Sequence, residues 1–333
     1  MKIDKTAIIG AGSWGTALAW LWGKEGRQIS LWGHNADRVA RMQKTRENSD
    51  YLPGLKLPDS VSVTHELRGC ADADLLVFVT PSTALRAIAL GLQGELTKNR
   101  TVLLSCTKGI EYGTGMRMSQ ILGEIFAEHT IAALSGPNLA AEVVRKVPTA
   151  AVIGCRDAGC AAQLQNFLGS SRFRIYTNDD VTSIELGGAL KNVFAIAAGA
   201  SDGLGLGDNT KAALLTRSLA ELIRLGSAMG GNFRTFYGLS GLGDLIATCF
   251  SKHSRNRRVG EHLGRGQTLD QITSTMQMVA EGIPTTRSAY ECARRLNIDT
   301  PITDEVYALL YAGKTPAHAM QDLLKRDQKA EQL

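Results

Sequence analysis

Residues 6–15 have the sequence TAIIGAGSWG, and this stretch decides the fold of the chain. Its first four residues are apolar or β-branched, which predicts a buried strand at 6–9, and segment 16–24 after it has helical composition. Between them, Gly10, Gly12 and Gly15 permit in turn a tight bend, a close approach of a phosphate to the backbone, and close packing of helix on strand. The stretch predicts a dinucleotide-binding turn with the pyrophosphate at the helix N-terminus; a plain glycine-rich turn is the alternative.

Downstream of this turn, short β-rich segments alternate with helix-length segments, a pattern that predicts parallel strands joined by crossover helices. Strand signals then cease near residues 178–181, and segments such as 210–225 and 285–296 have helical length and periodicity. We therefore expect an α/β Rossmann-type, doubly wound, mainly parallel sheet in a dinucleotide-binding domain of residues 1–179. An all-helical C-terminal domain of residues 180–333 follows it. The expected strands are 6–9, 29–32, 61–64, 75–80, 101–105 and 131–134, with 150–153 and 173–176 extending the same sheet.

The overall composition is that of a soluble globular protein. The 333 residues correspond to two domains at roughly 150 residues each. Hydrophobic residues make up 44% and charged residues 21%, which excludes the disordered, collagenous and coiled-coil classes. No apolar run reaches the roughly 18 to 20 residues that cross a bilayer, and the N-terminus lacks a signal peptide's apolar stretch and cleavage site. We expect no integral membrane segment and a cytoplasmic location.

Cysteines and charge narrow the choice of ligand. The six cysteines include no CxxC pair and no His-rich neighbourhood, so we expect buried thiols, with neither a disulfide framework nor a metal site. The net charge of +5 is mild and favours anionic ligands such as phosphates. The one dense basic run, 255–258, lacks the interleaved aromatic residues of a single-strand platform, so nucleic acid is not expected as a partner.

The end of the second predicted strand bears on the choice of cofactor. An NAD-specific domain of this kind normally has Asp or Glu there for the ribose 2′-hydroxyl, whereas this chain has Trp32-Gly33-His34-Asn35. His34, Asn35 and the nearby Arg38 are neutral or cationic, so a 2′-phosphate is tolerated and NADP(H) becomes possible. The alternative is that Arg38 simply faces solvent on the next helix.

Three other strand ends are expected at the same crevice, because ligands of doubly wound sheets bind at the carboxyl ends of the strands. They are Thr80-Pro81-Ser82, the run from Ser105 to Gly109, and Ser135-Gly136-Pro137-Asn138. Lys108, directly after a buried strand, is a candidate for contacting cofactor or substrate oxygens, or else a solvated loop lysine. The Gly136-Pro137 pair brings backbone amides near a ligand or is merely a turn.

In the helical half, Lys191 and Asn192 interrupt a helix of small and apolar residues that continues VFAIAA. A helix that is hydrophobic on nearly all sides is buried, and a buried lysine needs an anion or a function. Burial would lower the pKa of Lys191 towards the range for proton transfer, so it is the best general acid/base candidate. A lysine that reaches the surface is the alternative.

Two further motifs follow in the helical half. The sequence GLSGLGD ends in Asp244, which either caps the next helix or holds Lys191. Ser254 can cap another helix, with Arg255 and Asn256 in its first turn. Cations there oppose the helix dipole unless an anion is bound, so a phosphate site is expected, with a solvated or nucleic-acid patch as the alternative.

Taken together, these motifs resemble one family, the bacterial-type NAD(P)-dependent glycerol-3-phosphate dehydrogenases. The matching stretches span residues 10–286: GAGSWGTALA, TPS, TKGIE, SGPN, LKNVFAIAAGASDGLGLGDNTKAALLTR, GLSGLGDLIATCFSKHSRNRRVG and VAEGIPTT. The long stretch from Leu190 and the one around Asp244 are far more specific than the glycine motif. Two departures from the family pattern are Asn138, where Ser or Thr is more usual, and Ser218, where Gly is common.

The resemblance implies a role for each matching residue. Lys191 would be the catalytic proton donor and acceptor. The implied cofactor-binding residues are Gly10, Gly12, Ser13, Trp14, Gly15, His34, Lys108, Ala140, Arg255, Val279 and Glu281. The implied substrate-binding residues are Lys108, Gly136, Asn138, Lys191, Asp244, Ser254, Arg255 and Asn256.

The implied reaction is reversible hydride transfer between dihydroxyacetone phosphate and sn-glycerol 3-phosphate with NADP(H) and/or NAD(H), supplying glycerol 3-phosphate for phospholipid synthesis. A homodimer is expected. Two alternatives stay open: a related two-domain 3-hydroxy acid dehydrogenase, and a catalytically inert NAD(P)-sensing module.

Overall fold

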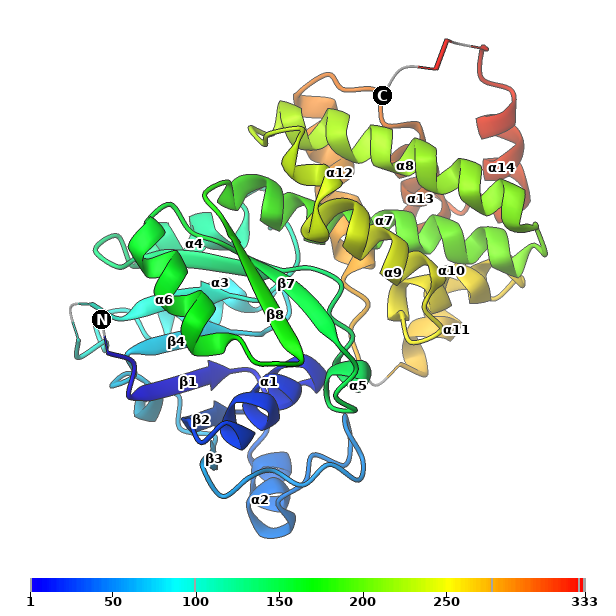
Figure 1. Ribbon diagram of the computed structural model, residues 1–333. Coiled ribbons are helices and arrows are strands. Elements are labelled where there is room, and N and C mark those ends of the chain that lie inside the picture. The colour runs from blue at the N-terminus through cyan, green and yellow to red at the C-terminus, as the bar shows by residue number, and fades with distance from the viewer. Residues whose placement is uncertain (1, 99, 277, 329, 332–333) are drawn as a thin grey trace. The chain divides into compact units, whose positions relative to one another are not determined.

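The computed structural model describes residues 2–98, 100–276, 278–328 and 330–331, and its chain divides into two compact units (Figure 1). The first unit comprises Met1–Thr107 and Met118–Val181, and the second comprises Lys108–Arg117 and Thr182–Leu333. The chain thus leaves the first unit at residue 108, returns at 118 and leaves again at 182.

One eight-stranded sheet forms the centre of the first unit, in the order β3-β2-β1-β4-β5-β6-β7-β8. All neighbouring strands are parallel except β6 and β7, which are antiparallel. The order reverses between β1 and β4, which is the position where doubly wound sheets bind ligands. The predicted mainly parallel sheet is confirmed. Its strands are β1 Lys5–Ile9, β2 Gln28–Trp32, β3 Val61–Thr64, β4 Leu75–Phe78, β5 Val102–Ser105, β6 Ile131–Ser135, β7 Thr149–Gly154 and β8 Phe173–Asn178.

Helices connect these strands and pack against the sheet. The core between them is built from aliphatic side chains and Trp22, whose indole N–H donates to the carbonyl oxygen of Leu168. α6 begins because the side chain of Asp157 accepts hydrogen bonds from two of its free N–H groups. The helices of this unit are α1 Ser13–Lys24, α2 Ala36–Thr45, α3 Leu85–Leu90, α4 Met118–Ile125, α5 Ala140–Val143 and α6 Ala158–Leu168.

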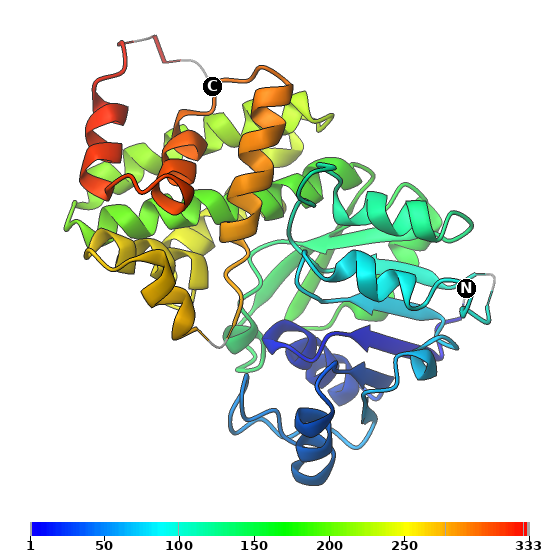
Figure 2. The ribbon, with the colours of Figure 1, turned by 180° about the vertical axis from the view of Figure 1, so that it is seen from behind.

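The second unit is helical apart from the isolated bridge between Ile110 and Arg117, as far as the structure describes it. In Figure 2, the orange α12 and the red α14 lie on the same side of the green α7 and α8. The all-helical expectation is confirmed, and two predicted helices begin earlier than expected: α8 covers 208–228 instead of 210–225, and α12 covers 282–295 instead of 285–296. The helices are α7 Val181–Gly203, α8 Asp208–Ala228, α9 Asp244–Phe250, α10 Arg255–Gly264, α11 Leu269–Ser274, α12 Gly282–Arg295, α13 Pro301–Tyr311 and α14 Pro316–Leu324.

α7 corrects one sequence expectation. With 23 residues and a mean hydropathy of 1.2, it is long and apolar enough to cross a membrane, although no such run was expected. However, 89% of its apolar window is buried inside the structure. Its apolarity is that of a core helix: Leu190, Val193 and Phe194 all lie in the hydrophobic core of the second unit.

The short segment Lys108–Arg117 belongs to the second unit although only two residues separate it from β5. Ile110 is buried in the helical core, and its carbonyl oxygen accepts a hydrogen bond of 2.9 Å from Ser288 Oγ of α12. Arg117 forms a buried ion pair with Glu185 of α7. These contacts, made by residues far apart in the sequence, fix Lys108 on the helical side. All six cysteines are buried, as predicted.

Candidate active site

The predicted general acid/base lies deep in the second unit. Lys191 is at the middle of α7, and only 7% of its surface is exposed. Gly187 on the same helix allows close packing, since a Cβ at this position would lie 2.7 Å from the carbonyl oxygen of Ser240. The helix therefore packs directly against the backbone of the π-helical turn Leu239–Gly243, which leads into α9. Lys191 does not reach the surface, so the sequence alternative of an exposed lysine is wrong.

Asp244 holds two lysines at once. One carboxylate oxygen accepts from Lys191 Nζ at 3.0 Å, and the other accepts from Lys108 Nζ at 2.5 Å. Asp244 is itself buried and is the first residue of α9, while Gly243 occupies the cap position. Of the two roles that the sequence left open for Asp244, the structure shows the second, a partner for Lys191. Lys108 is likewise paired rather than a solvated loop lysine.

The electrostatics of this cluster favour proton transfer near neutral pH. Burial lowers the pKa of Lys191 from its ordinary 10.5 to about 8. The positive charge of Lys108 acts in the same direction, and the carboxylate of Asp244 opposes both. Lys191 can thus exist as an ammonium or as a free amine within one pH unit of 8, which is what a reversible proton donor requires.

Thr248 is a member of the cluster that the sequence analysis missed. Its hydroxyl lies 2.5 Å from Lys191 Nζ and also 3.2 Å from the carboxylate of Asp244. A signal was available, because residues four apart on a helix share a face and Thr248 is four residues after Asp244 on α9. The hydroxyl gives the amine of Lys191 a second fixed partner.

The predicted phosphate site at the start of α10 has the expected cap. Ser254 Oγ accepts from the backbone N–H of Arg257 at 3.2 Å. Arg255 occupies the first turn, is exposed, and donates to the carbonyl oxygen of Val279 at 2.7 Å. The structure thereby brings together two residues that the resemblance assigned to the cofactor.

Asn256 is positioned more tightly than its neighbours. Its amide donates to Asn192 Oδ1 at 2.8 Å and accepts from the N–H of Gly282 at 2.9 Å. Both contacts are buried, so Asn256 joins α7, α10 and the start of α12. Glu281 immediately precedes α12.

The other predicted residues belong to the first unit, where the glycine motif has the expected geometry. Gly10 has φ +126°, and a Cβ there would lie 2.4 Å from the carbonyl oxygen of Val79. A Cβ at Gly15 would lie 1.9 Å from the carbonyl oxygen of Gly10. By contrast, a Cβ at Gly12 would meet no atom within 4 Å, and Gly12 caps α1 without a side-chain hydrogen bond. The residues fit a dinucleotide: two glycines allow the turn, and the third leaves the α1 N-terminus open to a phosphate.

Ser13 and Trp14 form the first turn of α1, which begins three residues earlier than predicted because Gly12 supplies its cap. Trp14 packs on the ring of Phe173, with ring centroids 6.3 Å apart.

His34 is exposed just after the end of β2. Asn35 caps α2, and Arg38 is paired with Asp50 at 2.8 Å. Arg38 therefore does not simply face solvent.

After β6, Gly136 has φ +132° and lies against the backbone of β7, and α5 begins at Ala140. The amide of Asn138 donates to the carbonyl oxygen of Ala150 at 3.2 Å. Its Oδ1 is buried and has no hydrogen-bond partner among the described residues. That orphan acceptor can receive a donor from a ligand.

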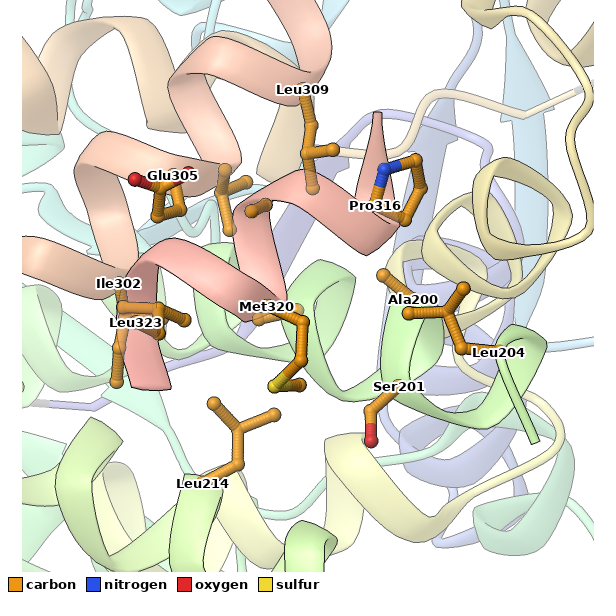
Figure 3. Close-up of a pocket in the computed structure, with 13 residues that line it drawn as sticks. Ala200, Ser201, Leu204, Leu214, Ile302, Glu305, Leu309, Pro316, Met320 and Leu323 are labelled. Carbon is orange, nitrogen blue, oxygen red and sulfur yellow. The ribbon is translucent and has the colours of Figure 1, made fainter. Parts of the chain in front are cut away.

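A separate, mostly apolar pocket occurs among α7, α8, α13 and α14 (Figure 3). It holds about 360 Å³ of empty space, open solvent included, and is lined by side chains such as Leu214, Met320 and Leu323. Its acid, Glu305, is ion-paired with Lys314. Neither Lys191 nor Asp244 lines it, so it is not the predicted site.

Comparison with known proteins identifies the family. Residues 5–161 match the N-terminus of NAD-dependent glycerol-3-phosphate dehydrogenase, and residues 180–321 match its C-terminus. The chain belongs to the NAD-dependent glycerol-3-phosphate dehydrogenase family. The predicted resemblance is thus confirmed.

Among relatives named glycerol-3-phosphate dehydrogenase [NAD(P)+], that of Desulfitobacterium hafniense is 46% identical, over 98% of this chain and 93% of its own. That of Syntrophotalea carbinolica is 47% identical, over 97% and 98%.

Solved structures agree with this family assignment. The crystal structure of glycerol-3-phosphate dehydrogenase from Coxiella burnetii superposes with a TM-score of 0.94 at 36% identity, covering 97% of this chain and 99% of its own. Membership of the glycerol-3-phosphate dehydrogenase family accounts for both halves of the chain together. It therefore excludes the two alternatives that the sequence left open, a 3-hydroxy acid dehydrogenase and an inert NAD(P)-sensing module.

Proposed function

We propose that this family member catalyses reversible hydride transfer between dihydroxyacetone phosphate and sn-glycerol 3-phosphate, with NADP(H) or NAD(H). It is an NAD(P)-dependent oxidoreductase acting on a CH–OH group. The observation that supports this activity most directly is the buried cluster of Lys191, Lys108 and Asp244, with the pKa of Lys191 lowered to about 8.

The proposed chemistry centres on Lys191. When bound, the nicotinamide cofactor supplies or accepts the hydride. As the ketone carbon is reduced, negative charge develops on its oxygen, and the ammonium of Lys191 donates a proton to it. In the reverse direction the free amine removes that proton. Asp244 and Thr248 orient Nζ through the contacts of 3.0 and 2.5 Å. Lys108 adds a second positive charge that stabilises the developing oxyanion.

The ligand assignments extend this proposal. The turn of Gly10, Gly12 and Gly15 with Ser13, Trp14, His34 and Ala140 would hold the cofactor, together with Lys108, Arg255, Val279 and Glu281. Arg255 and the capped N-terminus of α10 would bind the substrate phosphate, which supplies orientation and binding energy remote from the reacting carbon. Gly136, Asn138, Ser254 and Asn256 complete the proposed substrate set.

The physiological setting is also proposed. Residues 1–179, apart from the excursion Lys108–Arg117, would form the dinucleotide-binding domain, and 180–333 with that excursion the catalytic domain. The protein would act in the cytoplasm as a homodimer and supply glycerol 3-phosphate for phospholipid synthesis.

The activity is tested by following oxidation of NADPH and NADH at 340 nm with dihydroxyacetone phosphate and with unphosphorylated dihydroxyacetone. We expect rapid oxidation only with the phosphorylated ketone. Equal rates with both ketones, or no oxidation of either cofactor, would contradict the proposal.

A further inference from the structure

A charged cluster in the first unit is formed by α2, the helix that follows β2, and by the loop after it, and involves an acid that no sequence motif indicated. Asp50 accepts from Arg38 Nε at 2.8 Å and from an Arg41 amino group at 3.0 Å through the same carboxylate oxygen. The Arg38 guanidinium also lies 4.8 Å over the ring of Tyr51 and donates to its hydroxyl at 3.3 Å. We call these four residues the Arg38 cluster.

The position of the cluster links it to cofactor choice. In a Gly-x-Gly-x-x-Gly domain, the residue that distinguishes a ribose 2′-hydroxyl from a 2′-phosphate stands at the end of the second strand. Here that end is His34-Asn35, and the Asn35 side chain is already used as the cap of α2, accepting from Arg38 N at 2.8 Å. Arg38, in the first turn of α2, is the nearest permanent cation along the chain.

Asp50 and Tyr51 act differently on Arg38. The stacking and hydroxyl contact with Tyr51 place the guanidinium and do not depend on Asp50. Asp50 places a negative charge beside it. The hydrogen bond from Arg38 holds the pKa of this carboxyl below its usual range, so Asp50 is ionised at neutral pH. With both arginines, the cluster has a net charge of +1, and loss of the Asp50 charge would make it +2.

We propose that Asp50 determines cofactor specificity: its carboxylate competes with the 2′-phosphate of NADP(H) for Arg38 and so limits the preference for NADP(H) over NAD(H). A phosphate is both attracted to Arg38 and repelled by Asp50. A ribose hydroxyl is uncharged and is nearly indifferent to either. This inference rests on the proposed use of both cofactors.

The test is a double-mutant cycle on the full-length protein. We expect Asp50→Asn to raise the NADPH/NADH ratio of kcat/KM about fivefold to tenfold, the scale of one added unit charge in a partly exposed site. The change should arise mainly from the KM for NADPH, with NADH kinetics altered less than about twofold, as for an uncharged ribose hydroxyl. Arg38→Ala should lower the ratio about tenfold or more, and adding Asp50→Asn to it should raise the ratio much less than Asp50→Asn does in the wild type, because only the direct repulsion and the pairing with Arg41 then remain.

Asp37→Asn is the matched control, since Asp37 lies in the same first turn of α2, is exposed, and has no ion pair in the described structure. It should leave the ratio unchanged. An unchanged or lowered ratio in Asp50→Asn would overturn the inference, and so would an equal rise in the Arg38→Ala background. If the wild type oxidised neither cofactor, the proposed function itself would fail. Unaltered NADH kinetics in Asp50→Asn show that the variant is folded.

Discussion

Replacing Asp244 by Asn should move the pH range in which the enzyme reduces its ketone. In the wild type, Lys191 is an ammonium below its pKa of about 8. Because reduction requires that proton, kcat/KM for the ketone should fall as pH rises through 8. Oxidation of the alcohol requires the free amine, so its kcat/KM should rise over the same range.

The magnitude follows from the distance between the charges. Asp244 lies 3.0 Å from Lys191 Nζ, and its charge works against the lowering of the lysine pKa. With an effective dielectric constant of about 20, Coulomb's law gives an attraction of roughly 5 kcal/mol at this distance. Asparagine still accepts a hydrogen bond and the site relaxes, so we expect a smaller effect, a further decrease of at least about one pKa unit. At pH 8, Asp244→Asn should then retain less than about a tenth of the activity it has at acidic pH.

The measurement is a profile of kcat/KM for ketone reduction from pH 6 to 9.5, with Thr248→Val as the control. That control removes a partner of Lys191 without removing a charge, so its alkaline limb should shift much less. If Asp244→Asn had the same alkaline limb as the wild type, the carboxylate would not set the pKa of Lys191, and the argument from the cluster would be refuted.

Three further predictions follow from the second unit. Lys191→Met should lower kcat by roughly two to four orders of magnitude while cofactor binding survives, the usual scale for loss of a general acid; a folded variant with a third of wild-type turnover would show that the role is wrongly assigned. Arg255→Ala should lower kcat/KM for the phosphorylated ketone about 10- to 100-fold and change that for dihydroxyacetone much less; Arg258→Ala on the same helix is the control, and equal losses for both ketones would exclude a phosphate contact. Burial raises the pKa of Glu221 from 4.5 to about 7 although its carboxylate accepts from Ile302 N and Thr303 N. The folded state therefore binds a proton at Glu221 more tightly than the unfolded state, so this residue should contribute on the order of 2 kcal/mol of added stability as pH falls from 7 to 4.5; urea titrations of Glu221→Gln should lack this contribution, and parallel pH profiles of wild type and variant would count against it.

The strands were predictable because local pattern determines them. Strands β1, β4 and β5 at the centre of the sheet are short, mostly apolar runs, and the alternating strand β3 is predicted correctly at both ends, Val61–Thr64. Ends that depend on pairing were less accurate: β8 continues to Asn178 because it pairs with β7 up to Gly154, which its own composition does not indicate.

The site was predictable only in part. Lys191 was predictable because a charged residue within an apolar helix can be recognised from the sequence alone. Its partners depend on three-dimensional contacts: Lys108 and Asp244 are 136 residues apart, and no local pattern joins them. The sequence does not indicate Asp50, because the acid that selects the cofactor is expected at the end of the second strand. Asp50 lies instead in the loop after α2.

The route of the chain between the two units restricts how such a protein can be recombined in evolution. A single breakpoint between residues 179 and 180 would transfer the helices without the excursion Lys108–Arg117. The inherited fragment would lack Ile110 from its core and would retain Asp244 with one of its two lysines. Exchange of either whole unit with a distant relative therefore requires three coordinated crossovers, at 107/108, 117/118 and 181/182, so the two units are expected to be inherited together.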